Sequence, residues 1–474
     1  MLLGYNAVER NTKELHPPVA QIWAIFNLYL DNVDPLLKVV HAPSFQKQLL
    51  QAVQNMDSLE AEVEILLFSI YFSAMISIPT EDCLSMFKES RVTLLERYRF
   101  GLEQCLIRSN FLMKPSLPVL QALVLYLATS LHAPFPSPKE SLLALSIQMA
   151  RTMNFHIEQP DHPSSGPQFA TLGQRTRTEM RRRLWWHIMT LDVRIAEETD
   201  KDPIIWEGMW NVKMPSNLDD AELDMTSSLP IPPRAGETFD ADVYLTQNSD
   251  TATDQRGSHD RRTDLSFTLM RMDINYAARR FSFSQDFCTV NGYDALCTVE
   301  ERVKSVERLV KDMDRRYLQF CNRNDAFSFF ERNAAKLILS RHFLVVQKNR
   351  QPAEVLQNCI LVLEAAAGMR RTHKKWGWLL RSHVELVALE LLWNCLSTMT
   401  SPAFGGENSN PSSEHLAGRL QHAWALAEIA FQRGKEDELH LCYGSQWTRI
   451  ADLRDVAIAI REGALDSGHI VEVV

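Results

Sequence analysis

The sequence has no closely spaced cysteines, no basic surplus and no apolar run long enough to cross a bilayer. Its eight cysteines are scattered without a C-x-x-C pair, and no Cys or His cluster has the spacing of a zinc site. We therefore predict no metal, no cofactor and no disulfide framework, which indicates a reducing compartment. The most apolar run, residues 65–78, is shorter than the roughly 18 to 20 residues that span a membrane. Residues 1–18 do not resemble a secretory signal.

The balance of charge is acidic. The chain has 50 Lys and Arg against 59 Asp and Glu, a formal net charge of -9 at pH 7. Proteins that grip nucleic acid over their whole surface usually carry a basic surplus, so this mode of binding is disfavoured, while a local basic face stays open. With 45% hydrophobic and 23% charged residues, the composition is that of a globular chain with a sizeable core.

Motifs of the common catalytic sites are also missing. The sequence contains no G-x-S-x-G, no G-x-x-x-x-G-K-[ST] and no H-E-x-x-H. His187, His342 and His383 lie in helical patterns and are interpreted as core or boundary residues. We predict no catalytic residue. An enzyme on an all-α scaffold, acting on a pathway intermediate, stays open as the alternative.

Two acidic segments define that alternative. "NDAFSFFE", from Asn324, nearly reproduces a terpene-synthase magnesium motif, whose oxygen ligands hold a diphosphate through Mg²⁺. At the position where that motif requires a final Glu, this sequence has Arg332. The acids of "DDAELD", from Asp219, have the wrong spacing for a helical D-D-x-x-D face. We interpret "DDAELD" as a solvated acidic loop and Asn324 or Asp325 as a helix cap.

Hydrophobic residues recur with a period of about 3.6 residues along most of the sequence. In "VAQIWAIFNLYL", Ile22, Ile25, Phe26 and Tyr29 fall on one helix face. Proline-rich breaks separate further helical runs, and no period-two run bounded by turn residues appears. The predicted fold class is all-α, a multi-helix assembly with long polar loops. The predicted helical runs are 44–55, 59–78, 86–107, 117–132, 139–154, 265–283, 298–320, 326–347, 353–369, 376–399 and 416–431.

Three arginines precede two tryptophans in "RRRLWWHIMTLD", residues 181–192. Thr176 and Glu179 have capping-box spacing, so the helix is predicted to begin there, with Glu179 and Arg183 as an i,i+4 pair. This segment could contact nucleic acid, lie on a membrane or belong to the core.

An apolar stripe decides between these readings. It is continuous along the helix and consists of Leu184, Ile188, Leu191 and Ile195, while Trp186 and Val193 extend the apolar surface around the helix. A helix this apolar on several sides belongs in a core, so Trp185 is predicted to be buried, with arginines and carboxylates forming a network. Asp192 is the expected partner of an arginine, near or distant in the sequence.

The order of these segments resembles a known family. "LLALSIQMARTMNFHIEQP", "RTEMRRRLWWHIMTLDVRIAEETDKDPII" and "NVKMPSNLDDAELD" follow one another as in the fungal-specific transcription factor domain, the middle regulatory region of fungal zinc-cluster transcription factors. The early "IFNLYLDNVDPLLKVVHAPSF", with its His-x-Pro-x-Phe, is similar to the family's opening. The matching signature residues are Arg181, Arg182, Arg183, Trp185, Trp186, Asp192, Pro215, Asn217 and Asp219.

The resemblance implies the organisation of the chain. We expect an N-terminal tail at 1–18 and the regulatory domain at 19–290, with a mobile loop at about 230–264. The helical region 291–474 is expected to continue the same assembly. The implied function is regulation of transcription in a fungal, secondary-metabolite pathway, and the implied place is the nucleus, with sharing with the cytoplasm left open.

The sequence departs from the family at two points. It contains nothing like the six-cysteine zinc cluster that reads DNA, and the glycine-arginine-proline step after the tryptophan helix reads "DKDP" from Asp200. Because that DNA-binding module needs its zinc to fold, we expect this chain alone not to bind a specific DNA site tightly. Protein partners are expected instead, with residues 298–320 as a docking surface. A small-molecule effector and a homodimer stay open, and no membrane association is expected.

Overall fold

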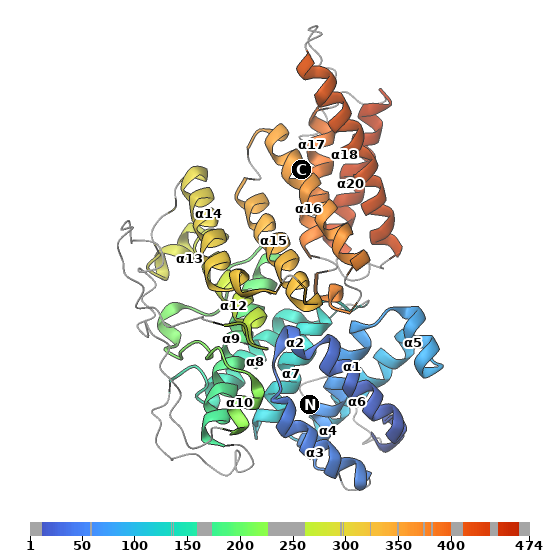
Figure 1. Ribbon diagram of the computed structural model, residues 1–474, viewed down its shortest axis with the longest axis vertical. Coiled ribbons are helices and arrows are strands. Elements are labelled where there is room, and N and C mark those ends of the chain that lie inside the picture. Colours follow the sequence, from blue (N-terminus) through green and yellow to red (C-terminus); the bar gives the residue numbers. More distant parts are fainter. Residues whose placement is uncertain are drawn as a thin grey trace. The chain divides into compact units, whose positions relative to one another are not determined.

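A computed structural model describes most of the chain (Figure 1). The described residues are 12–56, 59–133, 135, 137–158, 173–225, 261–293, 296, 298–322, 324–347, 350–372, 375–380, 383–399, 411–436 and 444–463. They fall into two compact units: those within 1–131, 138–295 and 312–321, and those within 132–137, 296–311 and 322–474. No strand occurs within these ranges, which confirms the predicted all-α fold class.

The first unit consists of α-helices and short 3-10 helices in the part of the chain that the structure describes. The helices are η1 (Thr12–Leu15), α1 (Val19–Asn32), α2 (Asp34–Leu37), α3 (Ala42–Gln54), α4 (Ala61–Ser77), α5 (Thr80–Phe87), α6 (Arg91–Arg108), α7 (Leu117–Ser130), α8 (Lys139–Thr152), α9 (Gln174–Thr199), η4 (Glu207–Met209), α10 (Asp220–Met225), α12 (Ser266–Ala278), α13 (Gln285–Val290) and η5 (Leu318–Phe320). The described cysteines of this unit are Cys83, Cys105, Cys288 and Cys321; each is buried, and none of them forms a disulfide.

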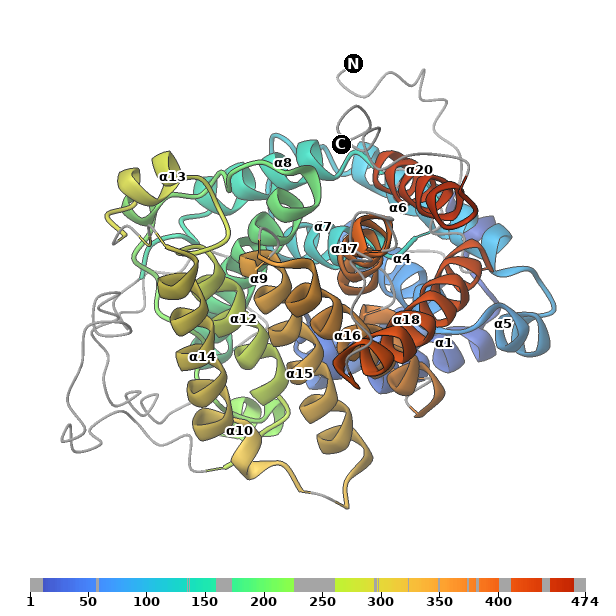
Figure 2. The same cartoon turned by 90° about the horizontal axis from the view of Figure 1, so that it is seen from above.

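Helix α4 forms the centre of the N-terminal part of this unit. Every residue from Glu64 to Ser77 is buried, because α1, α6 and α7 all pack against α4 (Figure 2). Gly101 lets α6 approach closely: a Cβ atom at this position would lie 2.6 Å from Cδ1 of Phe68. The absence of a side chain at Gly101 therefore sets the distance between α4 and α6.

The predicted run 86–107 is divided into two helices, so the prediction of one helix was wrong. Helix α5 ends at Phe87, and Lys88 takes a left-handed conformation with φ 62°. Helix α6 begins after Ser90, whose side chain accepts a hydrogen bond from the Thr93 amide at 3.1 Å. A left-handed residue followed by an N-cap serine ends one helix and starts the next without glycine or proline.

Helix α9 carries the Arg-Trp segment through the core. It packs against α7, α8 and α12, and Arg183, Trp185 and Trp186 are at most 1% exposed. The burial of Trp185 confirms the core interpretation over a nucleic-acid or membrane-surface one. The helix begins at Gln174, not at Thr176, so the predicted capping box was wrong. Thr176 lies within α9 and donates a hydrogen bond to the Leu223 carbonyl at 3.3 Å.

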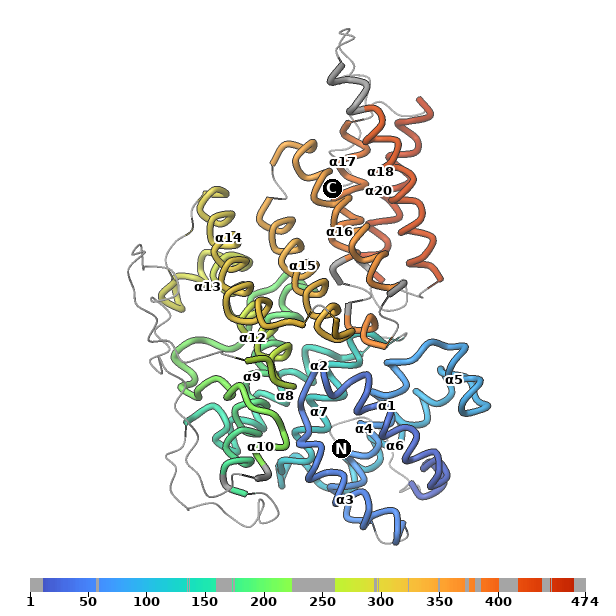
Figure 3. The backbone as a smooth tube through the Cα atoms, in the orientation of Figure 1, coloured from blue at the N-terminus to red at the C-terminus, as the bar shows by residue number. Residues whose placement is uncertain are grey.

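The second unit is a helical bundle (Figure 3). Its helices are most of α14 (Val299–Arg316), then α15 (Ala326–Gln347), α16 (Pro352–Thr372), η6 (Gly377–Leu380), α17 (His383–Met399), α18 (Pro411–Glu436) and α20 (Gly444–Arg461). Helix α17 packs against α15, α16, α18 and α20, and Trp393 at its middle is fully buried. The sequence did not predict α20.

Helix α14 lies within the predicted docking segment 298–320. Thr298 and Glu301 form a reciprocal cap: each backbone amide donates to the other residue's side chain, at 3.0 and 3.1 Å. One face of the helix is buried at Val306, Leu309 and Met313. A docking partner could therefore contact only its remaining, charged face.

Parts of the expected domain plan fall on undescribed residues. Most of the expected mobile loop at 230–264 lies outside the described residues, whereas residues 261–264 at its end are described and Thr263 is buried. Within the expected tail at 1–18, Thr12 is buried and donates a hydrogen bond to Glu64 of α4. In the part of the chain that the structure describes, no helix combines the length and apolarity needed to cross a membrane.

Candidate functional site

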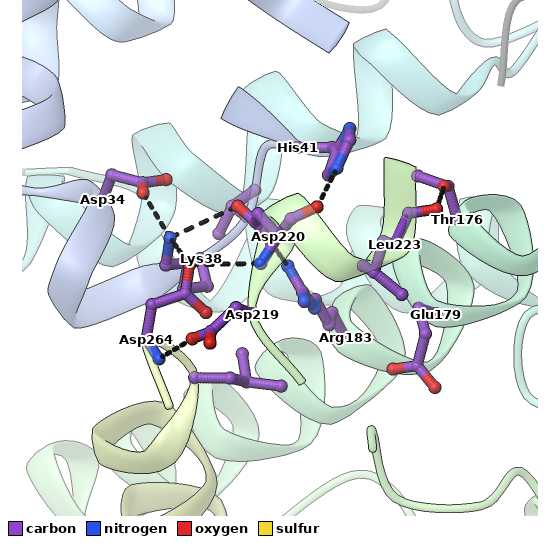
Figure 4. A network of polar contacts seen from close by, with 12 residues as sticks. Asp34, Lys38, His41, Thr176, Glu179, Arg183, Asp219, Asp220, Leu223 and Asp264 are labelled. Carbon is purple, nitrogen blue, oxygen red and sulfur yellow. Dashed lines mark hydrogen bonds and ion pairs between the residues drawn. The ribbon is translucent and has the colours of Figure 1, made fainter. Parts of the chain in front are cut away.

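The centre of the site is Lys38, the residue that follows α2. It is 5% exposed and takes a left-handed conformation with φ 49°. Its ammonium group lies 2.8 Å from Asp34, 2.8 Å from Asp264 and 3.2 Å from Asp220 (Figure 4). A cation at the C-terminal end of a helix also interacts favourably with the helix dipole. Lys38 thus joins α2 to α10 and to the residues before α12.

Arg183 of α9 completes this cluster. Its side chain has no exposed surface, and its Nη1 donates to Oδ1 of Asp220 at 2.6 Å. Burial by itself raises the pKa of the Asp220 carboxyl, but the Arg183 and Lys38 cations outweigh burial and hold that pKa below its usual range. We name Asp34, Lys38, Arg183, Asp220 and Asp264 the charge cluster.

The charge cluster contains three carboxyl groups and two cations. Burial raises the pKa of Asp34 to about 6, although Lys38 opposes this change. Burial likewise raises the pKa of Asp264 against the pull of Lys38. The charge cluster has one more carboxyl group than it has cations, so it takes up a proton below neutral pH. Its charges balance without an anion from outside.

The His-x-Pro-x-Phe segment, which begins at His41, contacts the charge cluster. His41 precedes α3, and its Nε2 lies 3.0 Å from the Asp220 carbonyl oxygen, while its Nδ1 lies 2.7 Å from the Ser44 hydroxyl. Phe45 is buried at the start of α3, where it contacts Phe26 of α1. The His-x-Pro-x-Phe segment thus connects α3 to α10.

Asn217 and Asp219 fasten the segment before α10 to the segment before α12. The Asn217 side-chain oxygen accepts hydrogen bonds from the hydroxyls of Thr263 (2.6 Å) and Ser266 (3.2 Å). Oδ1 of Asp219 accepts from the Asp264 amide at 2.7 Å. The two chain segments that flank residues 226–260 are therefore held together.

Arg182 belongs to a neighbouring group of contacts. It donates to Oε1 of Glu179 at 3.2 Å and to both carboxylate oxygens of Glu158. Glu179 also accepts from the Ser216 amide at 3.0 Å and from the Ser216 hydroxyl at 2.8 Å. The predicted pairing of Glu179 with Arg183 was wrong, because Glu179 binds Arg182 and the loop after α9, whereas Arg183 binds Asp220.

Trp186 contacts the loop that follows α9, and Arg181 contacts the segment that follows α8. Nε1 of Trp186 donates to the Lys213 carbonyl at 3.0 Å, and its ring contacts those of Trp210 and Tyr276. Pro215, farther along that loop, is buried. Arg181 lies over the Phe155 ring, 5.0 Å from its centroid, and donates to the Asn154 carbonyl.

Asp192 has the arginine partner that the sequence led us to expect, and this partner is the residue that follows α12. Arg279 lies 4.0 Å from Oδ2 of Asp192 and donates to the Ile205 carbonyl at 2.6 Å. The Asp192 carboxylate accepts from the amides of Ile204 and Ile205, each at 2.9 Å. Burial raises the pKa of Asp192 to about 6 despite these donors.

The acidic segments of the enzyme alternative have structural roles. Asp220 of "DDAELD" is 4% exposed and paired with two cations, so the interpretation of a solvated loop was wrong. Asp325 caps α15 as expected, since it accepts from the amide and the hydroxyl of Ser328, both at 2.8 Å. Among the described residues, no group of acidic, His and Cys side chains is arranged to hold a metal ion.

Sequence reasoning identified Arg183 and Asp219 but missed Lys38, Asp34 and Asp264. The available signal was an i,i+4 Asp–Lys pair inside the apolar stretch "VDPLLKVV", because charges within such a stretch are costly unless they are paired. Nothing local to Asp264 indicated that it meets Lys38, 226 residues away.

Comparison with known proteins shows which family part of the chain matches. Residues 26–252 match the model of the fungal specific transcription factor domain. Transcriptional regulator AacuB of Aspergillus aculeatus is 27% identical over 69% of this chain and 40% of its own length. Transcriptional regulator nsrM of Aspergillus novofumigatus is 33% identical over 46% of this chain and 29% of its own length.

A third relative is named after a biosynthesis cluster. Pyriculol/pyriculariol biosynthesis cluster transcription factor 1 of Pyricularia oryzae is 34% identical over 50% of this chain and 30% of its own length. The chain therefore carries a fungal specific transcription factor domain, and its charge cluster draws Asp34, Lys38, Arg183 and Asp220 from the matched residues. The chain spans less than half the length of these three relatives.

Proposed function

We propose that this chain regulates transcription of a fungal secondary-metabolite pathway. The observation that carries the proposal is the match of residues 26–252 to the fungal specific transcription factor domain. Relatives named as a pyriculol/pyriculariol cluster factor and an aurofusarin cluster factor support the assignment to a biosynthetic pathway. Regulation of transcription places the protein in the nucleus, at least in part, with a share in the cytoplasm.

The signature residues support a regulatory scaffold. Arg183 and Asp219 act through carboxylates and backbone groups of the same unit, and Trp185 and Trp186 have almost no exposed surface. Buried groups of this kind hold helices together and cannot reach DNA bases. We therefore assign Arg181, Arg182, Arg183, Trp185, Trp186, Asp192, Pro215, Asn217 and Asp219 a structural role in the regulatory domain.

We assign DNA recognition to a polypeptide segment or partner outside these 474 residues. Their net charge is -9, and they contain none of the closely spaced cysteines that a zinc cluster needs. The chain acts on promoters through protein partners, and the charged face of α14 is the proposed docking surface. A small-molecule effector and a homodimer are further parts of the proposal, the second testable by light scattering.

The test uses the complete chain in the fungus that encodes it. Deleting the gene should lower transcripts of one biosynthetic gene cluster, and a wild-type copy should restore them. A variant with several charges on the exposed face of α14 reversed should be present at wild-type levels but should not restore transcription. Unchanged transcripts after deletion would contradict the proposal. Turnover of a pathway intermediate by the purified chain would favour the enzyme alternative.

A further inference from the structure

One face of α9 carries a row of basic side chains. Arg183, His187 and Arg194 are four and seven residues apart, so they lie on the same side of the helix. Helix α12 packs against α9, and its Arg271 is close enough to lower the pKa of His187 by its positive charge. We name Arg183, His187, Arg194 and Arg271 the basic row.

Arg271 is a cation without an acidic partner among the described residues. Its Nη1 donates to the Leu36 carbonyl at 2.9 Å, and its guanidinium lies 5.9 Å from the Phe267 ring centroid. Burial, followed by the like charge of Arg194, lowers the pKa of Arg271 to about 9. Its positive charge is therefore less well compensated than that of Lys38 in the charge cluster.

The other members of the row have hydrogen-bonding atoms to spare. The Arg183 Nη1 binds Asp220, but its Nε and Nη2 are buried without a partner in the described structure. The Arg194 Nε is also unpartnered, and its Nη2 lies 3.7 Å from Glu198. Buried donors left unpaired destabilise a fold, so a molecule that pairs them binds with a gain in free energy.

His187 adds an acceptor to this face. Its ring hydrogen-bonds the backbone at Leu37, and its Nε2 is buried without a partner among the described residues. Burial, reinforced by the Arg271 charge, lowers the pKa of His187 to about 3, so the ring is neutral at physiological pH. Arg271 and His187 thus meet at the consecutive residues Leu36 and Leu37 at the end of α2.

The row is only partly buried at one end. Arg183 and His187 are 0% and 4% exposed, whereas Arg194 and Arg271 are only partly buried. A ligand of the row would therefore have to enter at the Arg194–Arg271 end. A planar carboxylate matches a guanidinium, which presents two parallel donors. The nearby acids Glu198 and Asp220 disfavour a doubly charged phosphate in the same place.

We propose that the basic row binds a small organic carboxylate, which Arg271 and Arg194 hold by charge-assisted hydrogen bonds. The neutral His187 accepts a hydrogen bond from a hydroxyl of the same molecule. An acidic metabolite bound here would order α2, α9 and α12 together. That effector role rests on the proposed regulatory function, whereas binding itself can be measured on the purified protein without promoters.

The test measures binding of defined probes to the full chain. Benzoate, salicylate, malonate, inorganic phosphate and chloride are titrated at matched ionic strength, with thermal shift and calorimetry as readouts. We expect at least one carboxylate to raise the melting temperature more than chloride and phosphate do. Arg271→Met should weaken that binding by at least about ten-fold, the loss of one charge-assisted hydrogen bond. Arg315→Met, at a side chain 64% exposed, is the matched control and should bind as wild type.

A second variant protects the test against misfolding. If Arg271→Met does not fold by circular dichroism, Arg194→Met takes its place. The proposal is overturned if no carboxylate exceeds chloride, if phosphate binds best, or if a folded variant of the row binds as tightly as wild type. If binding is found but transcription is unaffected by the same variants, the site stands and its effector role fails.

Discussion

Arg183 combines complete burial with a single strong partner. Its Nη1 lies 2.6 Å from Asp220, and the side chain has no exposed surface. Arg183→Met keeps much of the volume but leaves Asp220 with Lys38 as its remaining cation. Removing one partner of a buried ion pair costs about 3–5 kcal/mol, so we expect a loss of unfolding free energy of about that size. Urea denaturation followed by circular dichroism measures it.

A double-mutant cycle separates the pair from the general effect of removing an arginine. Asp220→Asn combined with Arg183→Met should cost less than the sum of the single changes, because the double variant leaves no unpaired charge on either side. Additive losses would show that Arg183 and Asp220 do not depend on each other.

His187 should make the fold sensitive to acid. Because its pKa is lowered to about 3 by burial and then by Arg271, the unfolded chain takes up a proton near pH 6.5 while the native protein does not. Stability should therefore fall as the pH drops from about 6.5 towards 3, by up to about 1.4 kcal/mol per pH unit from this residue. His187→Gln should flatten the pH dependence of the unfolding free energy in this range.

Other groups titrate in the same range with the opposite sign. The pKa of Asp192 is raised to about 6, so its native form takes up protons first and acid stabilises the fold through it. Comparing His187→Gln with wild type at each pH cancels this contribution. His422→Gln, at a side chain 54% exposed, is the control and should change the slope much less. Equal slopes for wild type and His187→Gln would show that His187 is not held neutral.

At the scale of elements, the approach of α6 to α4 depends on a missing side chain. A Cβ atom on Gly101 would lie 2.6 Å from Cδ1 of the buried Phe68, too close for any real contact. Gly101→Ala should therefore destabilise the protein by about 1–3 kcal/mol, despite the better helix propensity of alanine. The shift in the denaturation midpoint measures the effect.

Gly418 provides the opposite case on α18. Nothing lies within 4 Å of a Cβ atom built there, and the residue is exposed. Gly418→Ala should stabilise by about 0.5–1 kcal/mol, since alanine loses less backbone entropy in a helix. If both substitutions stabilise, Phe68 moves aside readily and Gly101 does not set the helix distance.

At the scale of the molecule, charge and composition govern contact with DNA. The chain of 474 residues has a net charge of -9, and its Arg-Trp segment is buried in α9. We expect no sub-micromolar, sequence-selective binding to pathway promoters at physiological salt. Fluorescence anisotropy with promoter fragments and scrambled duplexes of equal composition makes the comparison. Tight binding to the promoter alone would show that these residues read DNA themselves.

What the sequence determined by itself was local. The 3.6-residue period predicted an all-α fold and placed Trp185 in the core, because a helix shows its buried face in its own spacing. Periodicity could not detect the helix break at Lys88, because the left-handed residue there is a lysine and no glycine or proline marks the break in the sequence. It also failed at the start of α9, where Thr176 and Glu179 had cap spacing but bind other elements.

Only the tertiary structure decided which charges meet. Lys38 pairs with Asp220 and Asp264, which lie 182 and 226 residues farther along the chain. Asp220, which looked solvated in "DDAELD", is buried because α10 packs against α3 and α9. The buried Asp220 carboxylate is stable there because cations from two other elements, Lys38 after α2 and Arg183 of α9, reach it. The packing of elements that are distant in the sequence determines which charges pair, and no local pattern of residues predicts these pairs.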